Sequence, residues 1–118
     1  MPPLSDIGKL KRLADLFVIA MKVDGVISAK RNQAAIDCLV HHGLRERESE
    51  TFLDESFGKF ESGMIRSPEK TLGDVSTFFR RREHSFLLAQ VQTILEASEI
   101  SENSQAFFDL CCDYLYRK

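Results

Sequence analysis

The carboxylate of Asp24 is the side chain in this sequence whose position first suggests metal chemistry. It precedes Gly25 in a turn between two helical patterns, and a calcium loop likewise sets acids around the glycine of its sharp bend. Calcium needs several oxygen ligands and a bidentate acid at the loop's end, but in that register Ala20 and Lys22 occupy early ligand positions and Arg31 the last. Asp24 alone therefore remains as a candidate for weak binding of a divalent cation.

The cysteines and two of the histidines are the next candidates for metal binding or nucleophilic chemistry: Cys38, His41, His42, Cys111 and Cys112. Cys38 and His42 would share one helix face, but no Cys-x-x-Cys pair occurs, and neighbouring residues on a helix point in different directions. No recognisable base or oxyanion site accompanies a nucleophile. The sequence therefore predicts no catalytic residue, no cofactor and no enzyme, with the cysteines as small buried apolar side chains.

Composition and charge argue against several classes of partner. The 118 residues carry a formal net charge of −2, which gives no general attraction for nucleic acid or anionic membranes. The run Arg80-Arg81-Arg82 lacks a nucleic-acid-binding motif, and we expect it at the end of a helix, next to Glu83. The longest apolar run, 16–21, is too short for direct membrane insertion. An odd number of cysteines, two of them adjacent, indicates reduced thiols and a cytoplasmic location.

Helical periodicity of apolar residues covers the chain, and no stretch alternates as a strand would. We therefore expect one all-α domain over residues 1–118, compact and built of about six helices, with residues 1–4 as a flexible lead-in. The expected helices begin at Ser5 or Asp6, Ser28, Leu44, Ser67, Phe86 and Ser101, and they end at Met21, Gly43, Phe60, the arginine run 80–82, Leu95 and Leu115. The first helix is apolar over more than one stripe, which predicts a central position.

The loop after the first helix is predicted to be an architectural corner. Gly25 is expected at positive φ, a conformation that glycine takes without steric cost, and Ser28 is expected to cap the following helix. Asp24 would accept backbone N–H bonds at the helix end, and Ile27 would fill a place in the core. A second corner with Ile100 and Ser101 precedes the last helix in the same way.

These two corners indicate an internal repeat of a helix–loop–helix unit. Ile27-Ser28 matches Ile100-Ser101, and with one residue of slip the segment 33–37 matches 105–109. Each copy follows an apolar helical run. Two such halves are expected to pack together, each covering the apolar face that the other cannot bury alone.

The apolar helix through Met21, followed by Asp24-Gly25-Val26-Ile27-Ser28 and its echo up to Ile100-Ser101, resembles the signature of the tellurite-resistance TerB-like family. That family includes the N-terminal region of membrane-anchored DnaJ-like co-chaperones. The resemblance extends over residues 10–115 and implies an all-helical fold with two helix–loop–helix halves. Arg31 and Ser104 stand near positions where family members tend to carry an acid, and Ala97-Ser98 replaces a second Asp-Gly, so two carboxylates of a cation site would be missing.

A binding role at the corners is the function we expect. The resemblance implies a bacterial stress-response protein, and we expect a non-catalytic interaction or regulatory module that recognises an unidentified protein partner. Its surface would be the acidic corners, with Asp24 in the first half and Glu96, Glu99 and Glu102 in the second. The alternative is a protein with a degenerate acidic site for a divalent cation. The oligomeric state stays open at this point.

Overall fold

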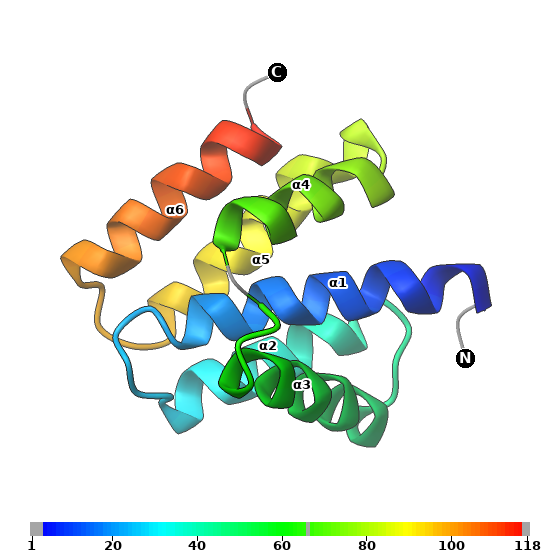
Figure 1. Cartoon of the computed structure of the whole chain (residues 1–118), viewed down its shortest axis with the longest axis horizontal. Coiled ribbons are helices and arrows are strands. Elements are labelled where there is room, and N and C mark those ends of the chain that lie inside the picture. Colours follow the sequence, from blue (N-terminus) through cyan, green and yellow to red (C-terminus); the bar gives the residue numbers. More distant parts are fainter. Residues whose placement is uncertain (1–3, 66, 117–118) are drawn as a thin grey trace.

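The structure is a computed structural model that describes the backbone of residues 4–65 and 67–116 and the side chains of these ranges from Ile7 onward. It contains six α-helices and no strand within these ranges (Figure 1). The helices are α1 (Leu4–Met21), α2 (Ala29–Val40), α3 (Glu46–Glu61), α4 (Pro68–Phe78), α5 (His84–Glu96) and α6 (Glu102–Leu115), with the short 3-10 helix η1 (Arg81–Glu83) before α5. The expected single all-α domain of about six helices is confirmed.

The start of α1 differs from the expectation. The helix begins at Leu4, so Ser5 and Asp6 lie inside it and do not cap it. Leu4, the last residue of the expected lead-in 1–4, is the first residue of this helix. Residues 1–3, the rest of the expected lead-in, lie outside the described residues.

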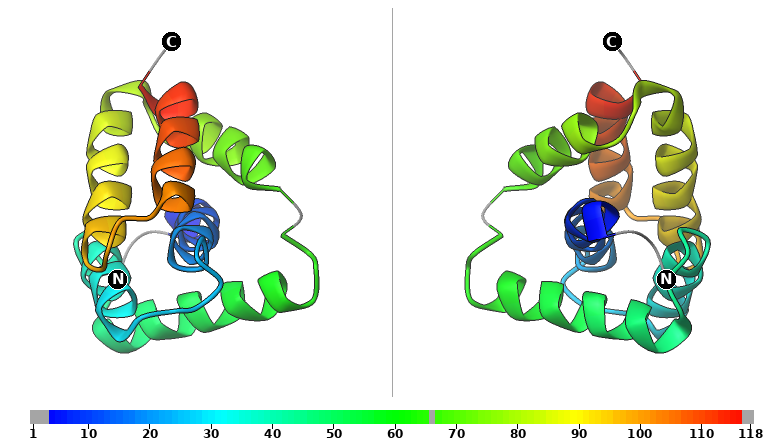
Figure 2. Two further views of the ribbon diagram at one scale, coloured as in Figure 1. Left: turned by 90° about the vertical axis from the view of Figure 1, so that its left-hand side faces the viewer. Right: turned by 90° about the vertical axis from the view of Figure 1, so that its right-hand side faces the viewer.

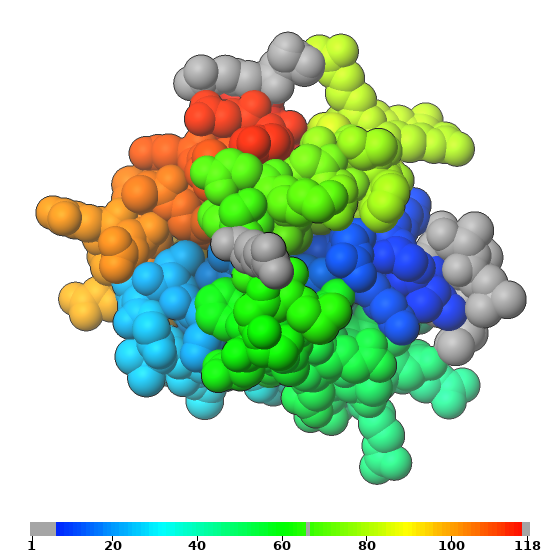
Figure 3. All heavy atoms as spheres, in the orientation of Figure 1, coloured from blue at the N-terminus to red at the C-terminus, as the bar shows by residue number. Residues whose placement is uncertain are grey.

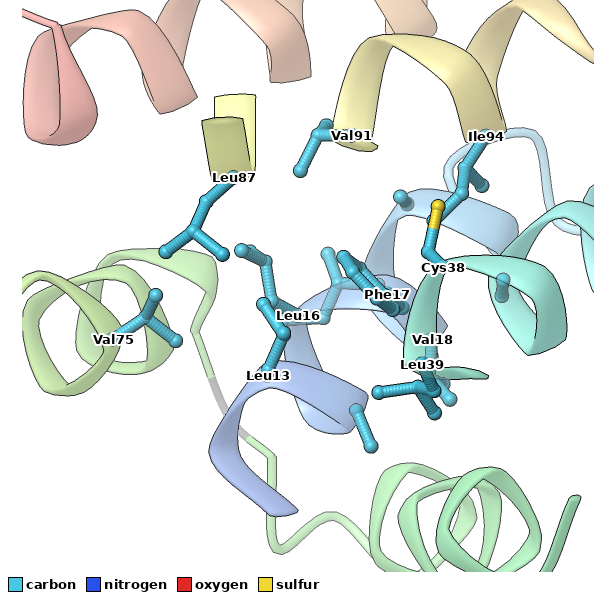
Figure 4. Packing of buried hydrophobic residues seen from close by; sticks show 14 of the residues in the cluster. Leu13, Leu16, Phe17, Val18, Cys38, Leu39, Val75, Leu87, Val91 and Ile94 are labelled. Carbon is cyan, nitrogen blue, oxygen red and sulfur yellow. The ribbon is translucent and has the colours of Figure 1, made fainter. Parts of the chain in front are cut away.

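Helix α1 is the central helix, as its broad apolar surface predicted. Every side chain from Leu13 to Met21 is buried, because α2, α3, α4 and α5 all contact α1. The end views in Figure 2 show α1 in the middle, with the other helices around it. In the close-up of Figure 4, Leu16 and Phe17 lie between residues from different helices, namely Leu39 of α2, Val75 of α4 and Leu87 and Val91 of α5. Burial of each such side chain stabilises the fold by about 1.5–3 kcal/mol.

A buried carboxylate joins α1 to α3. Asp15 is 1% exposed. It accepts a hydrogen bond from the Ser56 hydroxyl at 2.6 Å and from the Lys59 ammonium at 2.8 Å, and Arg12 approaches it at 3.0 Å. Because two cations and a hydroxyl satisfy the charge, the carboxylate is retained in the interior without an unpaired oxygen.

The arginine run does not lie at the C-terminal end of a helix, so this expectation is wrong. Helix α4 ends at Phe78, Phe79 is extended, and Arg80 precedes η1, which leads directly into α5. The Arg80 backbone N–H donates to the Glu83 carboxylate at 2.8 Å. The arginines therefore precede the N-terminus of α5, the opposite pole of a helix dipole from the one expected.

The described helices offer no transmembrane segment. None of them combines the length and the apolar character that a bilayer-spanning helix requires.

Candidate functional site

The two corners predicted from the sequence lie side by side. Corner 1 comprises residues 22–28, between α1 and α2, and corner 2 comprises residues 97–101, between α5 and α6. Both loops occupy the left-hand side of Figure 1, and both face the viewer in the left panel of Figure 2. Residues about 75 positions apart along the chain thus form one end of the molecule.

The two corners repeat one local design. Ser28 is extended and its hydroxyl accepts the backbone N–H of Arg31 at 3.0 Å; Ser101 does the same for Ser104, also at 3.0 Å. Further along each helix a glutamine side chain donates to an aspartate four residues on, Gln33 to Asp37 and Gln105 to Asp109, again at 3.0 Å in each copy. These matched bonds support the internal repeat, and both predicted serine caps are confirmed.

Gly25 ends the first helical run as expected. Its φ is +84°, in the region that glycine enters without the steric penalty of a Cβ. Its backbone N–H donates to the Lys22 carbonyl at 2.9 Å and closes the turn. This turn directs the chain from α1 into Ser28 and α2.

Arg31 is the residue that joins the corners. Its side chain is 2% exposed, and its guanidinium donates to the backbone carbonyls of Leu95 at 3.0 Å and Glu99 at 3.0 Å. It also donates to the Asp24 carboxylate at 3.1 Å and the Ser104 hydroxyl at 3.2 Å. A cation at the C-terminal end of α5 satisfies carbonyls that have no partner within the helix and favours the negative end of the dipole.

Asp24 completes this connection from the other side. Its carboxylate accepts hydrogen bonds from the hydroxyl of Ser101, from Arg31, and from the hydroxyl of Ser104 at 3.4 Å. The Ser101 hydrogen bond, together with Arg31 and Ser104, lowers the pKa of Asp24, although partial burial opposes the shift. The expectation that Asp24 accepts backbone N–H bonds is wrong within the described residues, because its partners there are side chains of α2 and the second half.

Three large apolar side chains are exposed where the corners meet. Val26 is 73% exposed, Ile100 45% and Ile27 37%. The expectation that Ile27 fills the core is therefore wrong; periodicity assigns an inward face only within a regular helix, and Ile27 lies before α2 begins. These three side chains line a hollow of about 690 Å³ together with Asp24, Arg31 and Glu99. In Figure 3, the atoms of both corners are adjacent at the left-hand end.

The predicted acidic residues are only partly brought together. Glu96, Glu99 and Glu102 are all exposed. Glu99 lines the hollow with Asp24, whereas Glu96 and Glu102 do not line it. Glu96 accepts a hydrogen bond from Gln92 on its own helix at 3.0 Å. Glu96 at the end of α5 and Glu102 at the start of α6 are thus close to Glu99 along the chain but are not part of the lining of the hollow.

The structure offers little for metal or thiol chemistry. The described residues contain no group of three or more His, Cys, Asp or Glu side chains that could hold a metal ion. Cys38 and Cys111 are buried, and burial raises the pKa of Cys38 to about 11 and raises that of Cys111 further. Neither thiol is therefore a reactive thiolate near neutral pH.

Sequence reasoning missed the role of Arg31, which it had considered only as a mismatch to a calcium loop and as a departure from a family pattern. A polar residue three positions after a capping serine recurs in both halves, as Arg31 and Ser104, and both are buried. That repeated position was the available signal. No family model, curated protein or solved structure matches this chain, so the resemblance to the TerB-like family rests on the residues quoted above.

Proposed function

We propose that this protein is a non-catalytic interaction module that binds a partner protein at the surface formed by the two corners. The observation that carries the proposal is the exposure of Val26, Ile27 and Ile100 around one hollow beside Glu99. Large apolar side chains gathered at one exposed place favour contact with another molecule, because water leaves this surface on binding.

The surface is preorganised, which lowers the cost of binding. Arg31 and Asp24 connect the corners through hydrogen bonds to Leu95, Glu99 and Ser101. A partner that contacts both loops would not have to order them first, and so would lose less conformational entropy. The ion pair between Arg31 and Asp24, in which only Arg31 is buried, thus acts on binding by holding together the corners that carry the apolar side chains.

The absence of catalysis is part of the proposal. Raised pKa values make the thiols of Cys38 and Cys111 poor nucleophiles, and burial limits access to them. The odd number of cysteines supports a cytoplasmic location, where thiols stay reduced. A regulatory role in bacterial stress physiology, of the TerB-like kind, rests on the resemblance alone.

A divalent-cation site at Asp24 is the less favoured alternative. The guanidinium of Arg31 lies against this carboxylate at 3.1 Å, so an added cation would meet a positive charge that is already in place. Calcium also requires several oxygen ligands. Calorimetric titration with calcium, magnesium and zinc is expected to show no binding, and saturable heat that disappears in Asp24→Asn would favour the cation site.

Co-precipitation with corner variants tests the proposed function. Native protein is compared with the double variant Val26→Asp, Ile100→Asp and with the control Met64→Asp, because Met64 is 70% exposed but does not line the hollow. We expect a partner that is retained by native protein and by the control and is lost from the double variant. Circular dichroism must show the same helical content in all three proteins. Equal capture by all three would place binding elsewhere on the molecule.

A further inference from the structure

We infer that the partner segment is a peptide that places an apolar side chain in the hollow and a lysine or arginine beside it, facing Glu99. This inference rests on the proposed function and specifies the chemistry of the partner. It is carried by exposed apolar side chains that line one hollow with Glu99, which belongs to a segment of the chain that carries acids and no Lys or Arg.

The charge distribution is strongly asymmetric along the chain. From Glu83 to Tyr116 the sequence contains six Asp or Glu residues and no Lys or Arg, although the whole chain has a net charge of only −2. This segment forms α5, corner 2 and α6. The exposed acids of this segment that lie next to corner 2 in the sequence are Glu96, Glu99 and Glu102, of which Glu99 lines the hollow.

Arg31, the one cation among the described residues that line the hollow, is not available to a partner. Arg31 is 2% exposed, and its guanidinium is engaged by the Asp24 carboxylate and by carbonyls of the second half. Lys30 is exposed in the first turn of α2 but does not line the hollow. The charge that remains to be complemented is Glu99, so a basic side chain on the partner is favoured.

The apolar residues set the second requirement. Val26, Ile27 and Ile100 surround an open hollow of about 690 Å³, which suits a protruding side chain of a peptide. An apolar residue alone would leave Glu99 without a partner, and a basic residue alone would leave the three apolar side chains in water. A peptide that carries both kinds of residue a few positions apart satisfies both sides of the surface.

Other occupants fit the charge less well. A second copy related by a two-fold axis would bring the same surface to face this one, and that surface offers Glu99 no available basic side chain from the hollow. Nucleic acid and anionic membrane surfaces are repelled by the charge of Glu99. A basic and apolar peptide is therefore the occupant that the surface favours.

Peptide selection on the full chain tests this inference. A phage library of random dodecapeptides is selected on native protein after depletion on the double variant Val26→Asp, Ile100→Asp. We expect enriched sequences to carry Leu, Ile, Val, Met or an aromatic residue within four positions of Lys or Arg. If no enriched peptide depends on Val26 and Ile100, the proposed function itself is contradicted. If the peptides depend on these residues but lack basic residues, only the inference about charge is overturned.

A charge-neutralised variant gives the quantitative test. For the best synthetic peptide, the triple variant Glu96→Gln, Glu99→Gln, Glu102→Gln is expected to raise the dissociation constant about tenfold at low salt, since exposed charge pairs each contribute modestly. The effect should shrink at 0.5 M salt because of screening. The control Glu46→Gln, Glu50→Gln, Asp54→Asn removes the same charge from exposed positions of α3 and should change binding less than twofold. Equal effects of the two triple variants on the dissociation constant would overturn the inference. It would also be overturned if the variant Glu96→Gln, Glu99→Gln, Glu102→Gln left the dissociation constant unchanged.

Discussion

The guanidinium of Arg31 donates to the backbone carbonyl of Leu95 through Nη2 at 3.0 Å and through Nε at 3.3 Å, although 64 residues separate the two. This contact connects the first turn of α2 to the last turn of α5. With the Asp24 carboxylate on the other side of the guanidinium, it holds corners 1 and 2 together. The fold and the proposed surface therefore depend on the same side chain.

Replacing Arg31 should destabilise the protein strongly. Arg31→Ala removes hydrogen bonds to Asp24, Leu95, Glu99 and Ser104. Several polar atoms lose their partners, so the free energy of unfolding should fall by about 2–4 kcal/mol. Urea unfolding followed by circular dichroism measures it. Arg31→Lys should recover only part of the loss, because an ammonium lacks the planar fork of donors.

The exposed neighbour Lys30 provides the control for this measurement. Lys30→Ala should change the free energy of unfolding by less than about 0.5 kcal/mol. A loss in Arg31→Ala as small as that in Lys30→Ala would show that the connection contributes nothing to stability.

Asp24→Asn should lower the free energy of unfolding at neutral pH and make this free energy less sensitive to acid. The pKa of Asp24 is lowered, first by the Ser101 hydrogen bond and also by Arg31. A carboxyl whose folded pKa lies below its unfolded value of about 3.9 stabilises the fold above that pH and loses its contribution as the pH falls through the folded pKa. The difference between native and Asp24→Asn in urea midpoint should therefore narrow between pH 5 and pH 3. A difference that stays constant with pH would contradict this role of the charge.

His42 should make the free energy of unfolding depend on pH in a higher range than the one in which Asp24 acts. Burial lowers the pKa of His42, and the charges of Lys9 and His41 act in the same direction, opposed by the Gln90 hydrogen bond and Glu83. The Nε2 atom of His42 lies 2.8 Å from the Gln90 side-chain oxygen, a contact that a neutral imidazole with its proton on Nε2 can make. An unfolded histidine takes up a proton near pH 6.5, so stability is full above this pH and declines as the pH falls toward the lower folded value.

The measurement for His42 is the free energy of unfolding between pH 8 and pH 5. His42→Gln should be less stable at pH 8 and should lose much of the decline below pH 6.5. His41→Gln, a change at the exposed neighbouring histidine, should keep the decline. If the native slope persists in His42→Gln, another group is responsible for it.

Asp15→Asn should weaken the packing of α3 against α1 and so lower the free energy of unfolding. The buried carboxylate binds Ser56 at 2.6 Å and Lys59 at 2.8 Å. An amide cannot balance the charges of Lys59 and Arg12, although both reach solvent in part, so we expect a loss of about 1–3 kcal/mol in urea unfolding. Asp54→Asn, at an exposed position of α3, is the matched control. An unchanged free energy of unfolding in Asp15→Asn would mean that apolar contacts alone hold α1 and α3 together.

Much of the architecture could be predicted from the sequence because it depends on local signals. The capping serines Ser28, Ser67 and Ser101 and the glycine Gly25 act through neighbouring backbone atoms, and each takes the expected conformation. The apolar surface of α1, which is wider than one stripe, likewise predicted its central position.

The charged interior could not be predicted because its partners are distant in the chain. Arg31 and Asp15 sit on helices where a charge normally marks the solvated face. Each has one partner nearby in the sequence, Asp24 and Arg12, but the partners on other helices, Leu95 and Ser56, lie 64 and 41 residues away. Ile27 was misplaced for a related reason, since a loop residue has no periodicity that fixes its direction. The two corners could therefore be predicted from the sequence, while their connection by Arg31 emerged only in three dimensions.

Site-specific photocrosslinking tests the central claim most directly. The photoreactive amino acid benzoylphenylalanine replaces Val26, Ile100 or Met64 in turn, in cells that naturally contain this protein; all three positions are exposed. Irradiation is expected to give the same discrete protein adduct from positions 26 and 100 and none from position 64, because only the first two line the hollow between the corners. Adducts from position 64 alone, or different adducts from positions 26 and 100, would contradict a single partner-binding surface at the corners.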